Sequence, residues 1–173
     1  MISIIGLGNA ASAVADLFSE IKQYKVYRLN SKVEKNTKYN FKLKTFGKPE
    51  DYELNMPDVR KFLSTTGENI QFFVMGGSFS SNYTLGILEQ IREKKIDLIY
   101  IQPDTELLTG YPVLIENTTF GVLQEYARSG LLNSITLISN LNIEESLGDI
   151  NIKNYYESLN NFVFSAVHHL NYF

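Results

Sequence analysis

The sequence predicts an α/β fold of three layers, in which a mainly parallel sheet carries helices on both faces. Three observations lead to this prediction. Short apolar runs typical of buried strands recur along the chain. Segments with apolar residues at helical spacing separate these runs. Two of the runs also end in glycine turns that lead directly into a helical segment. Because parallel strands need long crossover connections, this alternation favours a parallel sheet.

Six strands are expected, at residues 2–5, 24–30, 40–45, 70–75, 96–102 and 133–139. The segment at 70–75 is continuously apolar apart from one glutamine, as a strand buried on both faces would be. The segment at 40–45 instead alternates Phe41 and Leu43 with lysines, which predicts a half-exposed strand. The polar connection between 24–30 and 40–45 resembles a hairpin.

Helices are expected at residues 9–21, 57–63, 82–94, 118–129 and 153–172. Prolines in the segments 47–57 and 104–112 predict loops there. The last helix carries a long apolar stripe, made of Tyr155, Leu159, Phe162, Val163, Ala166 and Leu170. We expect this stripe to pack against the rest of the molecule.

Length and composition favour a single cytoplasmic domain over residues 1–173. The chain has 44% hydrophobic and 20% charged residues, no cysteine, and no apolar run near the roughly 18 residues of a membrane helix. No membrane partner is therefore expected. The net charge of −3 gives no drive toward nucleic acid. Nine basic residues do fall between Lys22 and Lys48, against the single acid Glu34. We interpret them as the solvated face of an edge strand.

Two glycine turns follow predicted strands, and both are candidates for anion binding. The first is Gly6-Leu7-Gly8-Asn9-Ala10-Ala11, and the second runs from Gly76 to Asn82. A helix that starts in a glycine turn can bind phosphate through its free N–H groups. The same turns also occur as plain strand-to-helix connections without a ligand. In a parallel sheet both would lie at the carboxyl edge, where ligands bind.

The first turn has the spacing G-x-G-x-x-A, which is compatible with a dinucleotide fingerprint. That scheme expects an acid at the end of the second strand, where this chain has Asn30. Arg28, Ser31 and Lys32 surround it and would suit a 2′-phosphate. An NAD(P)-binding domain of an oxidoreductase is therefore one alternative.

A family resemblance extends over nearly the whole chain, in order. Gly8-Asn9-Ala10-Ala11-Ser12 resembles the first phosphate loop of the tubulin and FtsZ superfamily. Met75-Gly76-Gly77-Ser78-Phe79-Ser80-Ser81-Asn82 resembles its G-G-G-T-G-[ST]-G signature loop. Leu29-Asn30-Ser31 resembles its Asn-Thr-Asp loop, the strand ending at Ser139-Asn140 resembles the FtsZ strand ending in Pro-Asn-Asp, and the helix with Asn160 and Asn161 resembles the guanine-reading helix.

The resemblance implies a Rossmann-like domain that binds GTP or GDP, with Mg²⁺, or that has lost its ligand. The implied nucleotide-binding residues are Gly6, Gly8, Asn9, Ala10, Asn30, Gly76, Gly77, Ser78, Phe79, Ser80, Ser81, Asn82, Asn140 and Asn161. It also implies self-association or an assembly partner. Serine, phenylalanine and asparagine stand at glycine and threonine positions of the signature loop, which predicts weak binding.

Hydrolysis of GTP is not expected from this chain alone. In the family, a loop with catalytic acids follows the guanine-reading helix, and this sequence stops at Phe173 before any such loop. No catalytic residue is assigned. No metal site is assigned either, because His168 and His169 are adjacent and diverge by about 100° on a helix. A third alternative is a ligand-free interaction module of a phage or bacterial assembly. The composition, rich in lysine, asparagine and isoleucine, is typical of an AT-rich bacterial or phage genome.

Overall fold

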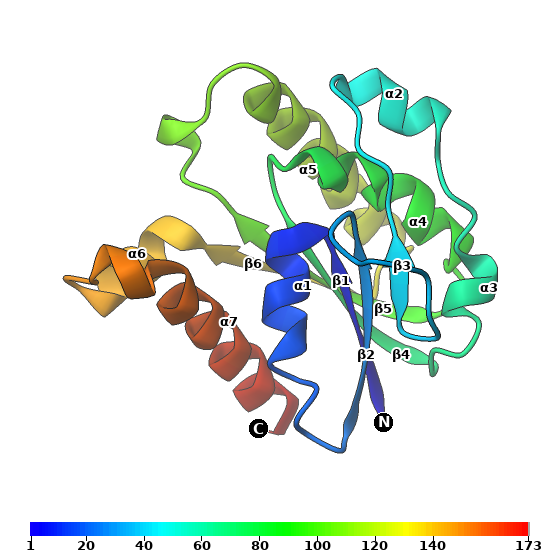
Figure 1. Cartoon of the computed structure of the whole chain (residues 1–173), viewed down its shortest axis with the longest axis horizontal. Coiled ribbons are helices and arrows are strands. Elements are labelled where there is room, and N and C mark those ends of the chain that lie inside the picture. Colours follow the sequence, from blue (N-terminus) through cyan, green and yellow to red (C-terminus); the bar gives the residue numbers. More distant parts are fainter. Residues whose placement is uncertain (173) are drawn as a thin grey trace.

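A computed structural model describes residues 1–172, which form a three-layer α/β fold around a six-stranded sheet (Figure 1). All strands are parallel, and their order is β3-β2-β1-β4-β5-β6. The strands are β1 (Ile2–Leu7), β2 (Tyr24–Asn30), β3 (Asn40–Lys42), β4 (Asn69–Met75), β5 (Lys95–Gln102) and β6 (Ser134–Ser139). This is the order of the Rossmann-like doubly wound folds. The expected fold class and all six strands are confirmed.

The connection between β2 and β3 is not a hairpin, contrary to our expectation. β3 pairs in parallel with β2, in the register that sets Arg28 beside Asn40. The chain therefore crosses back along the sheet margin before β3 begins. The strand is only three residues long, and the exposed lysines around it point to solvent, as expected for a protected edge.

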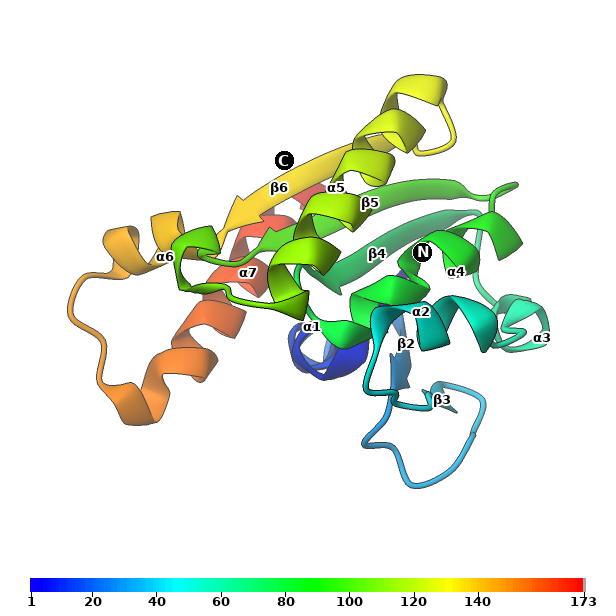
Figure 2. The ribbon, with the colours of Figure 1, turned by 90° about the horizontal axis from the view of Figure 1, so that it is seen from above.

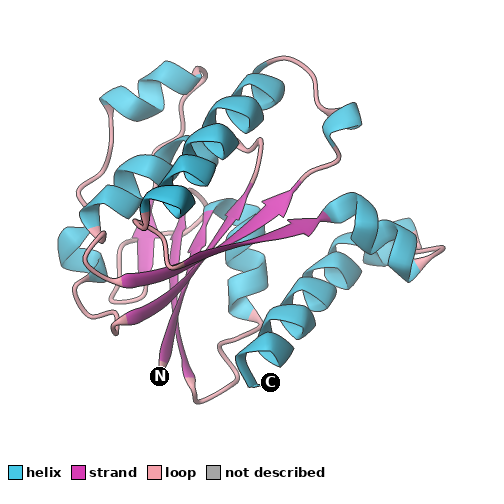
Figure 3. Ribbon diagram, turned by 180° about the vertical axis from the view of Figure 1, so that it is seen from behind, coloured by secondary structure: helices cyan, strands magenta, loops and turns pink. Residues whose placement is uncertain are grey.

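Helices cover both faces of the sheet (Figure 3). On one face lie α1 (Gly8–Asp16), α6 (Asn140–Leu147) and α7 (Tyr155–Tyr172). On the other lie α2 (Pro49–Leu54), α3 (Arg60–Leu63), α4 (Thr84–Gln90) and α5 (Tyr111–Ser129). Because strand side chains alternate between faces, neighbouring residues such as Ile4 and Ile5, or Phe72 and Phe73, belong to different cores. Two apolar cores on a sheet buried on both sides explain why the strands read as continuous apolar runs.

Several helix boundaries differ from the predicted ones, and two helices were missed. Residues 49–54 form α2 rather than a loop, because Pro49 occupies the first turn, where it disrupts no hydrogen bond. α6 begins where Ser139 accepts a hydrogen bond from the Asn142 N–H. α5 begins at Tyr111, earlier than expected, again with a proline in its first turn.

The remaining helices keep their predicted places but are shorter. α1 ends at Asp16 and continues only as turns, α3 begins at Arg60, and α4 is preceded by a short 3-10 helix, Phe79–Tyr83. The stripe by which α7 packs is also rotated. Leu159, Val163 and Val167 are buried, whereas Leu170 is 65% exposed. Among residues 1–172, none of the helices is both long and apolar enough to cross a bilayer.

Polar side chains fix the end of α7 to the sheet. Asn171 exchanges two hydrogen bonds with Gln71 of β4, at 2.6 and 2.9 Å, and its Nδ2 also donates to the Tyr24 hydroxyl. The Tyr24 hydroxyl lies 2.8 Å from His168 Nδ1. The helix thereby acquires a defined rotation, which decides which of its side chains point toward the carboxyl edge of the sheet.

Candidate functional site

The two glycine turns lie against each other at the carboxyl edge of the sheet, where β1 and β4 are neighbours. The chain leaves these strands in opposite directions, so this is the switch point at which doubly wound sheets bind ligands. Gly8 adopts a φ of +87°, and a Cβ there would lie 2.2 Å from the Ser80 Oγ. A side chain at Gly8 would thus strain the backbone and collide with Ser80. Because Gly8 has no side chain, the two loops can lie in direct contact.

Hydrogen bonds within the second turn use several of the predicted site residues. Ser78 Oγ donates to the Met75 carbonyl, and Ser81 Oγ donates to the Ser78 carbonyl. Asn82 Nδ2 donates to the Phe79 carbonyl. Ser81 is buried. Ser78, Ser81 and Asn82 therefore hold the turn in shape. Ser78 and Ser80 also line the open space in front of it.

A buried polar pair supports the second turn from below. The Tyr100 hydroxyl of β5 donates to the Glu116 carboxylate of α5, and both side chains are almost fully buried. A Cβ at Gly76 would lie 2.3 Å from both partners, so glycine is required by this packing. Burial, together with the Glu116 carboxylate, raises the pKa of Tyr100. The role of Gly76 is therefore to seat the loop on the pair.

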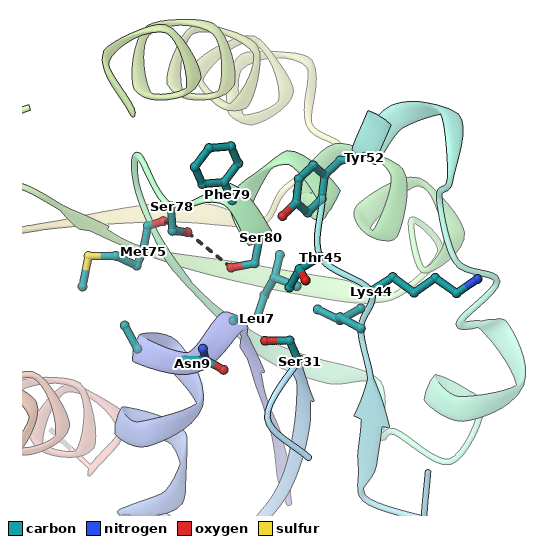
Figure 4. A pocket seen from close by; sticks show the side chains of 13 residues that line it. Leu7, Asn9, Ser31, Lys44, Thr45, Tyr52, Met75, Ser78, Phe79 and Ser80 are labelled. Carbon is teal, nitrogen blue, oxygen red and sulfur yellow. Dashed lines mark hydrogen bonds between the residues drawn. The ribbon is translucent and has the colours of Figure 1, made fainter. Parts of the chain in front are cut away.

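The first of two cavities, cavity A, has a volume of about 290 Å³ and lies between the carboxyl ends of β1, β2 and β4 (Figure 4). Its polar lining consists of Asn9, Ser31, Lys44, Thr45, Ser78 and Ser80. Its apolar lining includes Leu7, Leu43, Tyr52, Met75 and Phe79. Lys44 is the only cation of the lining among the described residues, and its side chain extends away from Ser78 and Ser80 in Figure 4. The cavity therefore offers hydroxyls and an amide rather than charge.

The second cavity, cavity B, has a volume of about 410 Å³ and lies between α1 and α7. It shares Asn9, Ala10 and Met75 with cavity A, so the first turn of α1 separates the two spaces and borders both. Its other lining residues are Ala13, Val14, Ile101, Asn140, Tyr155, Tyr156, Leu159, Asn160 and Val163. Aromatic, aliphatic and amide side chains thus surround this space.

Tyr155 is held in place at the mouth of cavity B. Its hydroxyl donates to the Glu144 carboxylate of α6, and that bond raises the pKa of Tyr155 to about 12. Asn140, the first residue of α6, lies at the carboxyl end of β6 and borders the same cavity. α6 thus contributes one lining amide directly and orients a tyrosine through Glu144.

Seven of the predicted residues border neither cavity. Four of them belong to the second turn itself, namely Gly76, Gly77, Ser81 and Asn82, and the other three are Gly6, Asn30 and Asn161. Gly6 lies inside β1, where a Cβ would come within 2.8 Å of the α1 backbone, so its role is helix packing. Asn30 accepts a hydrogen bond from the Lys32 N–H and closes its own turn. Asn161 borders a separate hollow on the outer side of α7, with Leu147 and Phe162 among its neighbours, and its amide bonds to the Glu157 carbonyl.

Several lining residues do not belong to the set of nucleotide-binding residues that the resemblance implied. Asn160, next to Asn161, is the residue of that pair that borders cavity B. Tyr155 and Tyr156 are the aromatic residues of the same helix turn. Ser31, Lys44 and Thr45 follow β2 and β3 and border cavity A. Ser31 is part of the possible 2′-phosphate group and of the loop that resembles Asn-Thr-Asp, although not of the implied set. Lys44 and Thr45 fall inside the strand expected at 40–45, so the sequence carries no signal that these two line a cavity.

No group of three or more metal-ligating side chains occurs within residues 1–172. Arg28, which sequence reasoning placed near a 2′-phosphate, instead pairs with Asp16 at the end of α1. Comparison with models of known protein families finds no match, and comparison with curated proteins finds no similar sequence. The assignment of a function therefore depends on the geometry of the two cavities.

Proposed function

We propose that this chain is a tubulin/FtsZ-like protein that binds GTP or GDP weakly and has a structural or assembly role. One observation carries the proposal: two cavities meet at the first turn of α1, which borders both through Asn9 and Ala10. A nucleotide has the matching shape, with a ring system at one end and phosphates at the other. The resemblance of the two glycine turns to the phosphate loops of that superfamily supports the same assignment.

In this proposal the base occupies cavity B. Tyr155 and Leu159 offer apolar surface to a ring, and the amides of Asn140 and Asn160 can donate to and accept from a base edge. The phosphates lie at the N-terminus of α1, where the helix dipole favours negative charge. The terminal phosphates extend toward Ser78 and Ser80 in cavity A.

The charge of the site suits weak binding. A triphosphate carries several negative charges, and the only lysine bordering cavity A extends away from the serines. Mg²⁺, which prefers oxygen ligands and keeps several waters, would accompany the phosphates rather than be held by side chains of the site. Neither lining includes an Asp or Glu within the described part of the chain, so the proposal is limited to binding.

A dinucleotide such as NAD(P) is the second candidate, favoured by the strand order and by the G-x-G-x-x-A turn. Two of the groups that would recognise its adenosine ribose are otherwise engaged. Asn30 closes its own turn, and Arg28 pairs with Asp16. We therefore favour the mononucleotide.

Thermal unfolding of the chain with GTP, GDP, NADH or NADPH, each with Mg²⁺, tests the proposal. A ligand at 100 times its dissociation constant should stabilise the fold by about 2.7 kcal/mol and raise the midpoint. Stabilisation by a nicotinamide cofactor alone would contradict the proposal. No response to any of the four would favour the ligand-free interaction module.

Two neighbouring substitutions locate the base. Asn160→Ala removes an amide from cavity B, whereas Asn161→Ala removes one from the outer side of the same helix turn. Loss of one hydrogen bond, worth about 0.5–1.5 kcal/mol, should weaken GTP binding by roughly 2- to 13-fold in the first variant. The second variant should bind like the parent. Equal effects, or a larger effect at Asn161, would place the base elsewhere.

A further inference from the structure

The two edges of the sheet are built differently. β3, at one edge, has three residues and exposed lysines around it at positions 38, 42 and 44. β6, at the other, has six residues with the sequence Ser-Ile-Thr-Leu-Ile-Ser, without charge or proline. Short strands, lysines and prolines are the usual means of preventing edge strands from pairing with another chain. Within β6 itself the protein uses none of these.

The outward-facing backbone groups of β6 can be identified from the register. The Ile96 carbonyl accepts from the Asn133 N–H, so the even-numbered residues of β5 bond toward β6. Leu98 and Tyr100 therefore bond to the neighbours of their register partners Ile135 and Leu137. The N–H and C=O groups of Ile135 and Leu137, and the N–H group of Ser139, consequently point away from the sheet. The Ser139 carbonyl instead belongs to the N-cap of α6, where it accepts the first bond of that helix. Figure 2 shows β6 at the margin of the sheet, and among the described residues no strand follows it in the strand order.

We propose that the β6 edge is a homodimer interface, in which two copies of this chain pair their β6 strands antiparallel across a two-fold axis. The axis would pass beside Leu137, so that Leu137 lies opposite its own copy and Ile135 lies opposite Ser139. In this register the two copies of Leu137 exchange both backbone hydrogen bonds, and the Ser139 N–H of each copy faces the Ile135 carbonyl of the other. The two six-stranded sheets would then join into one continuous sheet.

The chemistry of the strand selects a second copy as the occupant. A two-fold pairing places each strand against its own sequence, which is repulsive wherever like charges oppose each other. β6 carries no charge, so no such pair arises. Leu137 is 49% exposed, although it lies in the middle of a strand. Pairing would place it against the same residue of the partner and remove apolar surface from water.

This interface would give the assembly role a specific surface, but it does not depend on nucleotide binding. The thermal-shift titration measures the nucleotide site separately. A chain that binds GTP yet stays monomeric would overturn the interface and leave the nucleotide site standing. A dimer that binds no nucleotide would overturn the proposed nucleotide site and leave the interface standing.

Light scattering over a concentration series should show a mass rising toward twice that of the chain. Leu137→Lys places two like charges opposite each other and should keep the chain monomeric. Leu170→Lys changes an equally apolar and more exposed residue on α7, and it should dimerise like the parent. Circular dichroism verifies that both variants are folded. A monomeric parent, or a Leu137→Lys variant that still dimerises, would overturn the proposal.

Cross-linking tests the register, and the chain offers a clean background because it contains no cysteine. Hydrogen-bonded antiparallel pairs have a Cα separation of about 5.5 Å, within the range that a disulfide spans. Leu137→Cys should therefore form a covalent dimer under mild oxidation, much faster than Leu170→Cys. Equal rates for the two variants would show collision rather than pairing and would contradict this geometry.

Discussion

At the scale of single residues, the glycines of the site are the most informative. Gly8 is required twice, once for its φ of +87° and once because Ser80 occupies the space of its Cβ. Gly76 is required because the Tyr100–Glu116 pair lies directly beneath it. A sequence pattern cannot separate these reasons from ligand binding, since all of them select glycine. The structure shows that the second turn is seated on a buried polar pair.

Gly8→Ala should destabilise the fold. An L-residue in the left-handed region costs about 1–2 kcal/mol, and displacing Ser80 adds to that cost. Gly47→Ala is the matched control, because a Cβ there meets no atom within 4 Å and its φ is not positive. Urea denaturation should show a lower midpoint for the first variant only. Equal midpoints would mean that the two turns do not touch as described.

At the scale of elements, buried parallel strands were predictable and short helices were not. Strands such as β4 lie in the sheet interior, so they contain long apolar runs that stand out from the surrounding sequence. α2 was missed because Pro49 was read as a breaker, although proline is well suited to a first helical turn. α6 was missed because Leu141, Ile143 and Leu147 do not make a full helical stripe.

The rotation of α7 shows where sequence reasoning about the site reached its limit. Periodicity alone predicted a buried stripe that included Leu170, which is exposed. The actual rotation is fixed by contacts far apart in the sequence, such as Asn171 with Gln71. It decides that Asn160, and not Asn161, borders cavity B. Which amide faces a ligand is therefore a tertiary property.

Asn171→Ala should loosen this docking of α7. Gln71 is 8% exposed, and the substitution would remove both hydrogen bonds that its buried amide makes with Asn171. An unsatisfied buried polar group costs about 1–3 kcal/mol. Amide hydrogen exchange should quicken in the last turns of α7, and the free energy of unfolding should fall. Asn161→Ala, which removes a side chain bonded only within its own helix, should change neither by a comparable amount.

At the scale of the whole molecule, buried tyrosine hydroxyls link stability to alkaline pH. Burial is the first cause of the raised pKa of Tyr24, Tyr83, Tyr100 and Tyr126, and for Tyr83 the pKa reaches about 12. The bond to Glu144 raises that of Tyr155 to about 12. These side chains come from both faces of the sheet. The dependence of stability on alkaline pH should therefore involve both apolar cores.

The sign of the effect follows from proton linkage. In the unfolded chain a tyrosine loses its proton near pH 10, whereas the folded chain retains protons on these residues. Above pH 10 the unfolded state thus binds fewer protons, and the free energy of unfolding falls as the pH rises, through about pH 12 for Tyr83 and Tyr155. Each tyrosine that stays protonated contributes a loss of about 1.4 kcal/mol per pH unit.

Thermal unfolding from pH 8 to about pH 11 measures this linkage, since most tyrosines ionise above pH 10 when unfolded. The midpoint should be level below pH 10 and fall above it. Tyr100→Phe removes the hydroxyl whose pKa is raised by burial and by the Glu116 carboxylate, so the variant should start from a lower midpoint at neutral pH and then fall less steeply. A slope identical to that of the parent would mean that Tyr100 is not part of the linkage. A rise in midpoint above pH 10 would contradict the sign for the whole set.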